Sequence, residues 1–406
     1  MFKNFSRHSK ILFCAYFGLL LMFSIFSFGL TTPNLILINT TWFSSFQFWM
    51  WNHFYHNRHL VSVVFSIFIT LFFLIYFLLI KSFSKNKPIS LKQQITLILL
   101  LSTPLLFSSN ILSNDVFNYI FNSRIVLKYQ ANPHLKTALD YPSDNWTRFM
   151  HNTHTPAPYG YVWTALSLIP YIFGAGKFLV TWLSFRLFII LSLILSSVAI
   201  STLYTSQSNK HINLKKWSLF FFNPLVILEV VNNFHNDLWM MAPIVLSIAL
   251  FIHKKENFVW SLLLFIFSVA VKFSSLALLP LILIIIFSKL KLSKLNQLVK
   301  KITNLIPEIA SILMFLPLFT ARSQQFHPWY FLWVLIWAPS IKNRYIKNSI
   351  LIFSITSLFR YLPWLQNNGY SQEILIQQKI ITWSAIPISL IYFLLMRATH
   401  KIHAKN

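Results

Sequence analysis

The sequence has few charged residues, few glycines and almost no cysteine, and each shortage argues against a class of protein. Only 10% of its 406 residues are charged, whereas soluble domains carry about 25%. A soluble globule is excluded, because so apolar a chain would expose extensive hydrophobic surface to water. The single cysteine, Cys14, excludes a disulfide framework within the chain. Six glycines beside 42 phenylalanines disfavour an outer-membrane barrel, whose strands alternate in hydropathy and end in turn residues.

Apolar runs take up most of the chain, and 56% of the residues are hydrophobic. Many of these runs approach the roughly 20 residues with which a helix crosses a bilayer. We therefore expect an all-α polytopic membrane protein, with a single transmembrane domain over residues 1–406 and an uncleaved N-terminal span. The twelve predicted spans are residues 11–30, 60–80, 93–112, 178–204, 217–231, 238–252, 258–271, 274–287, 303–319, 329–339, 349–362 and 380–396.

Two other segments are expected to touch the membrane without crossing it. Residues 160–174 are apolar but short and contain Pro170. If they crossed, the lysine-containing loop 205–216 would face outward, so we predict a re-entrant or partial helix. Residues 31–59 are aromatic and polar, which suits a segment lying along the outer interface.

The net charge of +26 is carried mainly by short lysine- and arginine-rich runs between the spans. This is the positive-inside pattern of membrane proteins, so we expect contact with membrane lipid and none with nucleic acid. It predicts that both termini lie in the cytoplasm and that the loop 113–158 lies outside; we expect the membrane to be the inner membrane of a bacterium. Acidic residues contribute little to orientation. Six of the eight nevertheless lie at the predicted outer side: Asp115, Asp140, Asp144, Glu229, Asp237 and Glu373.

The stretch 113–161 is polar within an apolar chain, and its first part is typical of an amphipathic helix. Asp115, Asn118 and Asn122 follow at i, i+3 and i+7, which places them on one helical face. A carboxylate at the membrane boundary is suited to act as a general base on a sugar hydroxyl. The alternative is a structural anion in the first helical turn, where Asp is common.

Cationic and aromatic residues follow in the same stretch. Arg124 and Lys128 are four residues apart on the predicted helix. They either hold a phosphate at the interface or extend toward lipid head groups. The aromatic residues offer flat surfaces to a sugar ring, or form the aromatic belt of a membrane protein: Trp146, Tyr159, Tyr161 and Trp163.

Three later segments also place polar groups at the predicted outer side. Residues 232–237, NNFHND, are functional candidates because ionisable groups are costly near a membrane, although a polar turn is the alternative. Lys272 lies between two apolar runs, as a phosphate ligand or as the tip of a hairpin. The segment RSQQFHPWY, residues 322–330, adds Arg322, His327, Trp329 and Tyr330.

Histidine spacing raises the question of a metal site. His53, His56 and His59, or His151 and His154, have spacings compatible with zinc, but few carboxylates are near them and no cysteine joins them. A lone Asp115 also disfavours a magnesium site with paired carboxylates. We expect no metal and no other cofactor.

These motifs, in this order, resemble GT-C type membrane glycosyltransferases. The first outer loop of that superfamily is similar to NDVFNYIFNSR, ANPH, DYPSDNW and PYGYVW here, and further likenesses follow at 223–237, 271–280 and 326–333. The chain most resembles the polyprenol-phosphate-mannose-dependent group, which includes glycosyltransferase family 87 and the bacterial α-1,6-mannosyltransferases. It departs from that pattern at His134, where Tyr is usual, and at Tyr161, where Pro is usual.

The resemblance implies an inverting transfer of mannose or another hexose from a polyprenyl-phosphate donor to a glycan or glycolipid acceptor at the outer face. Asp115 would deprotonate the acceptor hydroxyl. The donor phosphate would contact Arg124, Lys128, Lys272 and Arg322. The substrates would contact Asn114, Tyr119, Asn132, Tyr159, Trp163, His235, Asn236, Asp237, His327, Trp329 and Tyr330.

Two other functions stay open. A transporter or lipid-linked-sugar flippase is the alternative from another class, and a glycan polymerase or ligase is the nearer enzymatic one. Transporters often carry internal repeats and broken helices with charges near the midplane. This sequence has no evident repeat and concentrates its polar residues in the 46-residue outer loop, 113–158, which favours the transferase.

Overall fold

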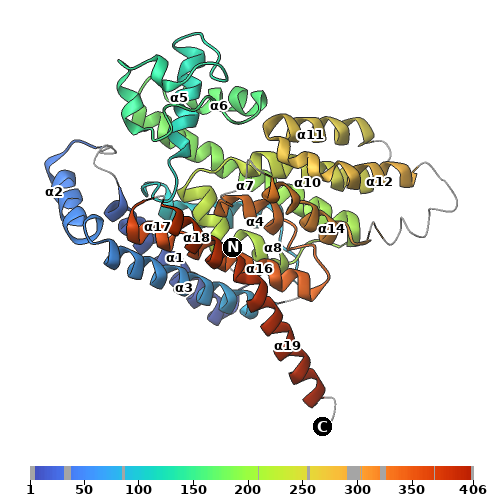
Figure 1. Cartoon of the computed structure of the whole chain (residues 1–406). Coiled ribbons are helices and arrows are strands. Elements are labelled where there is room, and N and C mark those ends of the chain that lie inside the picture. The colour runs from blue at the N-terminus through green and yellow to red at the C-terminus, as the bar shows by residue number, and fades with distance from the viewer. Residues whose placement is uncertain are drawn as a thin grey trace.

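The computed structural model describes residues 5–31, 38–84, 87–208, 210–253, 257–289, 302, 304–320, 326–369 and 371–403. Over these ranges the chain is helical and forms no strand, apart from one antiparallel bridge between Pro88 and Asn213. The helices gather into one bundle, from which α5 (Asp115–Leu127) and α6 (Tyr161–Phe173) project at one end (Figure 1). The predicted all-α class is confirmed.

Four helical segments of the described chain are long and apolar enough to cross a membrane. They are α1 with η2 (Arg7–Leu30), α3 (Arg58–Ser82), α7 (Phe178–Ser208) and the joined α18 and α19 (Gln372–Ala398). These agree with the spans predicted at 11–30, 60–80, 178–204 and 380–396. Large apolar side chains such as Met22, Ile67 and Leu187 are exposed along them, as expected for surfaces that face lipid.

The predicted count of about twelve spans is not confirmed. Five other apolar helices in the described chain are shorter: Tyr161–Phe173, Asp237–Ile252, Phe258–Val271, Phe273–Phe287 and Ile306–Phe319. The 13 residues of α6 extend only about 20 Å, whereas the hydrocarbon core is about 30 Å thick. This length agrees with the partial helix predicted at 160–174.

The predicted span at 217–231 is not one continuous helix. This run is broken into α8 (Leu214–Phe221), the short α9 (Pro224–Val226) and the π-helical turn η8 (Ile227–Asn232). All of its residues are buried. A high hydropathy shows only that a run avoids water, and either lipid or protein can shield it. Here other parts of the protein cover the run, so it belongs to the core and does not face lipid.

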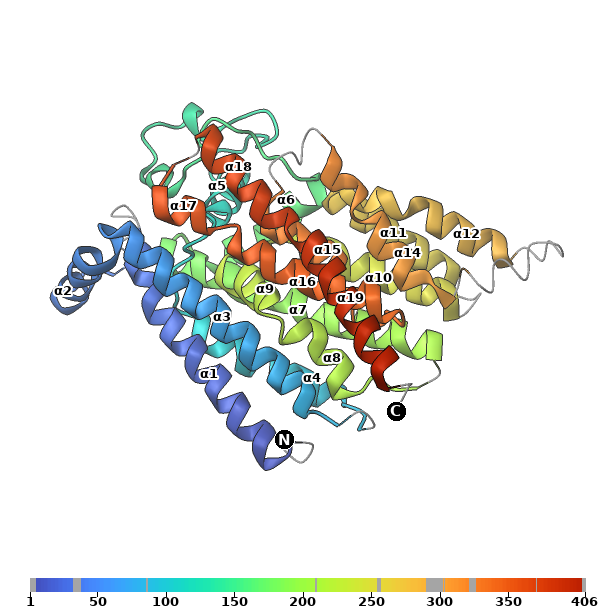
Figure 2. The ribbon, with the colours of Figure 1, turned by 60° about the horizontal axis from the view of Figure 1, so that its bottom comes forward.

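The centre of the bundle is formed by α7 and α10 (Asp237–His253), which pack along each other, with α11 (Phe258–Val271) against α10. On the other side, α1 packs on α3, and α16 (Arg344–Phe359) packs on α18 and α19 (Figure 2). The remaining elements are α2 (Thr41–Met50), η4 (Trp51–Tyr55), α4 (Leu91–Ser102), η5 (Thr103–Leu105), η6 (Ala138–Asp140), η7 (Asn145–Phe149), η10 (Phe273–Leu278), α12 (Leu279–Lys289), α14 (Ile306–Leu313), η11 (Leu316–Phe319), η13 (Pro328–Phe331), α15 (Leu332–Leu335) and α17 (Leu362–Asn367).

The start of α6 docks directly on the end of α11 because residue 160 is glycine. The amide of Gly160 donates a hydrogen bond to the carbonyl of Val271 at 3.0 Å. A Cβ at this position would lie 1.9 Å from the carbonyl oxygen of Ala270. This close approach of two backbones brings Tyr159, the residue before the glycine, toward Lys272, the residue after α11.

Candidate active site

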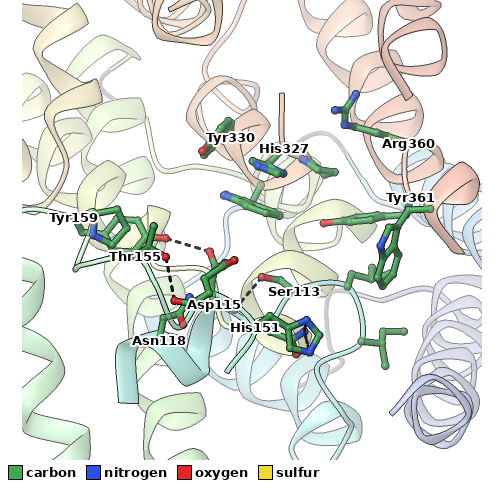
Figure 3. Close-up of a pocket in the computed structure, with 18 of the residues that line it drawn as sticks. Ser113, Asp115, Asn118, His151, Thr155, Tyr159, His327, Tyr330, Arg360 and Tyr361 are labelled. Carbon is green, nitrogen blue, oxygen red and sulfur yellow. Dashed lines mark hydrogen bonds between the residues drawn. The ribbon is translucent and has the colours of Figure 1, made fainter. Parts of the chain in front are cut away.

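A cavity of about 710 Å³ lies between the start of α5 and the segments that follow residue 326. The predicted polar face of α5 lines it, because Asp115, Asn118 and Asn122 are all lining residues. Figure 3 shows Asp115 and Asn118 in the wall of this cavity. The other lining residues are Ile111, Leu112, Ser113, Asn114, His151, Asn152, Thr155, Pro156, Pro158, Tyr159, His327, Pro328, Trp329, Tyr330, Arg360, Tyr361, Trp364 and Gln378.

Asp115 stands in the first turn of α5 with its carboxylate facing this cavity. The Tyr159 hydroxyl donates a hydrogen bond to Asp115 Oδ2 at 3.1 Å, and the Tyr119 hydroxyl lies 3.3 Å from that of Tyr159. Burial, with the Asp115 charge, raises the pKa of the Tyr159 hydroxyl well above its usual range, so Tyr159 stays protonated. The Asp115 side chain is 20% exposed, which leaves it open to a ligand. Asp115 is therefore an anion in the first helical turn and also a carboxylate that faces the cavity, so the two predicted roles are compatible.

A buried imidazole lies between Asp115 and a second carboxylate. His235 Nδ1 is 3.8 Å from Asp115 Oδ2, and His235 Nε2 is 3.3 Å from Glu229 Oε2. The side chains of His235 and Glu229 are fully buried. The His235 ring stacks on Trp329 with centroids 3.9 Å apart, and Trp329 in turn stacks on His327. The carboxylate of Asp115 is thus backed by a histidine whose other nitrogen faces an acid.

Irregular backbone places this histidine. The π-helical turn η8 carries Glu229, and π turns are frequent at functional sites. After it, Phe234 has a φ of +62°, a left-handed conformation that bulky residues rarely adopt. The Phe234 ring is covered by the buried guanidinium of Arg186, 4.3 Å from its centroid. The surrounding packing therefore over-determines the turn that presents His235.

A buried ion pair forms the next part of the site. Lys272 Nζ lies 2.6 Å from Asp237 Oδ1, and the Trp333 indole N–H donates to the same oxygen at 2.5 Å. The two charged side chains are 13% and 1% exposed. Lys272 Nζ is also within 5.3 Å of the ring centroids of Tyr159, Tyr330 and Trp333.

A second groove, of about 490 Å³, runs past Lys272 and adjoins the first cavity. The two share Pro158, Tyr159 and Tyr330. The rest of the groove is largely apolar, with lining residues Gly160, Phe273, Ser274, Ala277, Leu316, Pro317, Thr320 and Trp333. Tyr159 therefore separates a polar cavity that contains Asp115 from an apolar groove that contains Lys272.

Arg124 and Lys128 do not line either cavity, because both bind Asp144. Arg124 Nε lies 2.6 Å and Lys128 Nζ 3.1 Å from Asp144 Oδ2, and the Tyr129 hydroxyl donates to the same oxygen at 2.6 Å. The Arg124 guanidinium also lies over the Trp146 ring. Although burial alone would raise the pKa of Asp144, these bonds hold it well below its usual range.

The other predicted substrate contacts fall into three groups. Asn114, Tyr159, His327, Trp329 and Tyr330 line the first cavity. Tyr119, Trp163, His235, Asn236 and Asp237 are buried behind its lining, the last four at 2% exposure or less. Asn132 lies elsewhere, where its side chain accepts a hydrogen bond from the amide of His134. Arg322 lies outside the described residues.

The sequence interpretation missed the part of the wall formed by residues 360–378. Arg360, Tyr361, Trp364 and Gln378 line the first cavity, and Arg360 Nη1 donates to Thr382 Oγ1 at 3.2 Å. The available signal was a cation among aromatic residues at the end of an apolar run, the same composition as in the segment at 322–330.

Burial, with nearby Arg360, His235 and Lys272, lowers the pKa of His327 to about 3, so this ring is neutral.

Within the part of the chain that the structure describes, no three His, Cys, Asp or Glu side chains form a metal-binding group. One of the histidines considered for zinc, His151, lines the first cavity and lies 3.2 Å from Asn114. The predicted absence of a metal stays a prediction.

One protein-family model matches this chain, over residues 15–288. Its description is alpha-(1→6)-mannopyranosyltransferase, N-terminal domain, of the MptA/B family. The matched range contains Asp115, Glu229, His235 and Lys272. No curated protein and no solved structure gives a significant match.

Proposed function

Because this chain belongs to the alpha-(1→6)-mannopyranosyltransferase family, whose model covers residues 15–288 of its 406, we propose that it is an inverting GT-C type mannosyltransferase. The donor is a mannosyl polyprenyl phosphate and the acceptor is a hydroxyl of a glycan or glycolipid. The transfer takes place at the outer face of a bacterial inner membrane, with both termini in the cytoplasm.

The position of Asp115 carries this proposal. Among the described residues that line the first cavity it is the one carboxylate, and it is partly open to that space. As the acceptor oxygen attacks the anomeric carbon, Asp115 takes its proton. The bond from that carbon to the phosphate oxygen breaks, and the polyprenyl phosphate leaves with the electron pair. A single displacement of this kind inverts the anomeric configuration.

The groove beside Tyr159 suits the leaving group. Its apolar lining is compatible with a prenyl chain, and Lys272 would neutralise the phosphate as negative charge develops. Electrostatic stabilisation of this kind is often the largest catalytic contribution. Arg360 places a cation in the wall of the adjoining first cavity. We assign Arg124 and Lys128 to holding the loop through Asp144 instead, and a phosphate role for Arg322 stays a prediction.

The test uses membranes that contain the full chain and a radiolabelled polyprenyl-phosphate-mannose. Asp115→Asn is expected to lower the transfer rate by at least about 100-fold, since general bases contribute roughly 10²–10⁴, with unchanged expression and membrane insertion. The matched control is Asp140→Asn, in the same loop, where the carboxylate pairs with exposed Lys136. Near-normal transfer by Asp115→Asn would exclude Asp115 as the base. Movement of the labelled lipid across vesicles without bond formation would favour the flippase.

A further inference from the structure

A third cavity, of about 1230 Å³, lies at the opposite end of the bundle from Asp115. The length of α16 separates this cavity from the first cavity. Lys347, near the start of α16, lines the third cavity, and Arg360, just after its end, lines the first cavity. Thirteen residues of helix span about 20 Å. In Figure 2, α8 and the end of α19 lie low in the molecule, and α5, α6 and α17 lie at the top.

The polar part of this cavity is strongly basic. Its described lining includes four lysines and no Asp or Glu: Lys210, Lys215, Lys216 and Lys347, with His211, Asn213, Asn348, Tyr204 and Tyr392. Lys216 Nζ donates to the Tyr204 hydroxyl at 2.9 Å. Burial, with the neighbouring Lys216 and Lys215, lowers the pKa of Lys347, while Glu308 acts in the other direction. Glu308 Oε1 accepts hydrogen bonds from the amides of Lys342 and Asn343, whereas its buried Oε2 has no hydrogen-bond partner among the described residues.

The remaining wall is apolar, and part of it lies on the membrane-crossing helix α3. It consists of Phe77 and Ile80 near the end of α3, Pro88, Leu219 of α8, and Leu351, Ile352 and Ile355 of α16. A cation cluster at the end of apolar helices matches the two parts of a lipid, a charged head group and acyl chains. Basic pockets between transmembrane helices bind anionic lipid head groups in this way.

We propose that this basic cavity binds an anionic glycerophospholipid of the surrounding membrane. Its phosphate lies among Lys215, Lys216 and Lys347, and an acyl chain lies along Leu351 and Ile355. The lipid phosphate adds negative charge beside this group of neighbouring lysines. It is a ligand of the fold and takes no part in mannosyl transfer, so the proposal holds or fails independently of the role of Asp115.

The test is native mass spectrometry of the detergent-solubilised full chain with phosphatidylglycerol, phosphatidylcholine, a polyprenyl phosphate or inorganic phosphate. We expect preferential retention of phosphatidylglycerol. Because a lysine near an anionic lipid is worth about 5-fold in affinity, Lys216→Gln with Lys347→Gln is expected to weaken binding roughly 30-fold. The matched control, Lys10→Gln with Lys92→Gln, removes the same charge from exposed positions outside the cavity lining and is expected to change nothing.

Equal loss in both double variants, or equal retention in all three proteins, would overturn the proposal. So would displacement of phosphatidylglycerol by millimolar inorganic phosphate, or preference for the polyprenyl phosphate at the same lysines. If the double variant does not fold, Lys347→Arg and Lys347→Gln separate charge from packing. The arginine variant is expected to keep phosphatidylglycerol and the glutamine variant to lose about 5-fold.

Discussion

Lys272 is proposed to bind a phosphate and also holds a buried carboxylate, and one pair of variants separates these two roles. Lys272→Met removes the cation and leaves Asp237 buried without its ion pair, since that carboxylate is only 1% exposed. Breaking one side of a buried pair costs about 3–5 kcal/mol of stability. Loss of a group that stabilises transition-state charge lowers kcat by about 10²–10³. The single variant is therefore expected to lose both stability and activity.

The double variant, Lys272→Met with Asp237→Asn, removes the unpaired charge as well. Replacing both members of a buried pair is often close to neutral, and the Asn oxygen still accepts the Trp333 indole N–H. Stability is expected to return to within about 1–2 kcal/mol of wild type, while kcat/KM for the polyprenyl-phosphate donor stays low. The measurements are thermal unfolding in detergent and transfer kinetics on the same preparations.

A control double variant shows how much stability and activity change when an exposed ion pair is removed. Lys136→Met with Asp140→Asn removes an exposed i, i+4 pair, with side chains 52% and 35% exposed. Exposed pairs contribute about 0–1 kcal/mol, so this variant is expected to behave as wild type in both assays. If the Lys272 and Asp237 double variant regained activity together with stability, Lys272 would be a structural residue and the phosphate assignment would be wrong.

Three further predictions concern the loop and the orientation of the chain. Gly160→Ala is expected to cost about 1–3 kcal/mol and to lower transfer, because its Cβ meets the Ala270 carbonyl, whereas Gly18→Ala, with open space around it, is expected to be neutral or stabilising; thermal unfolding and transfer assays check both. Because the pKa of Asp144 is depressed, its contribution is present above about pH 4 and lost as the pH falls further. Asp144→Asn is thus expected to destabilise the loop by about 2–3 kcal/mol at pH 7. It is also expected to reduce the acid sensitivity of the loop, as measured by unfolding at pH 7 and at about pH 2; equal acid sensitivity would contradict this. A reporter fused at residue 208 is expected to give a cytoplasmic signal, and an outside signal would refute the proposed topology.

Local periodicity predicted the part of the site that is local in sequence. The spacing of Asp115, Asn118 and Asn122 defines one face of a helix, and the structure places that face in the first cavity. The same reasoning did not predict that Arg124 and Lys128 both contact Asp144, although it placed the two residues on one face of the helix. Their partner, Asp144, lies across a loop that contains the short 3₁₀ turn η6, and no sequence periodicity extends across such a loop.

Sequence patterns also could not predict which distant segments meet, because such contacts depend on how the helices pack. His235 meets Asp115 across 120 positions, and the wall at 360–378 closes on both only when α16 to α18 fold back over the bundle. The count of about twelve spans is not confirmed, and an apolar run in the sequence looks the same whether lipid or protein covers it. The four segments that are long enough to cross a membrane include two in which one helix continues into the next, α1 into η2 and α18 into α19.

The candidate site contains residues inside the range of the family match and residues beyond it. Asp115, His235 and Lys272 lie within residues 15–288, whereas His327, Trp329 and Arg360 lie beyond them. The second group is not peripheral, because Trp329 stacks on the ring of His235 and Arg360 adds positive charge to the cavity wall. Family membership therefore bears on the residues proposed for proton transfer and phosphate release. It bears least on the facing wall, where the shape of the acceptor would be selected, so variants at Trp364 and Gln378 are the ones to compare across different acceptors.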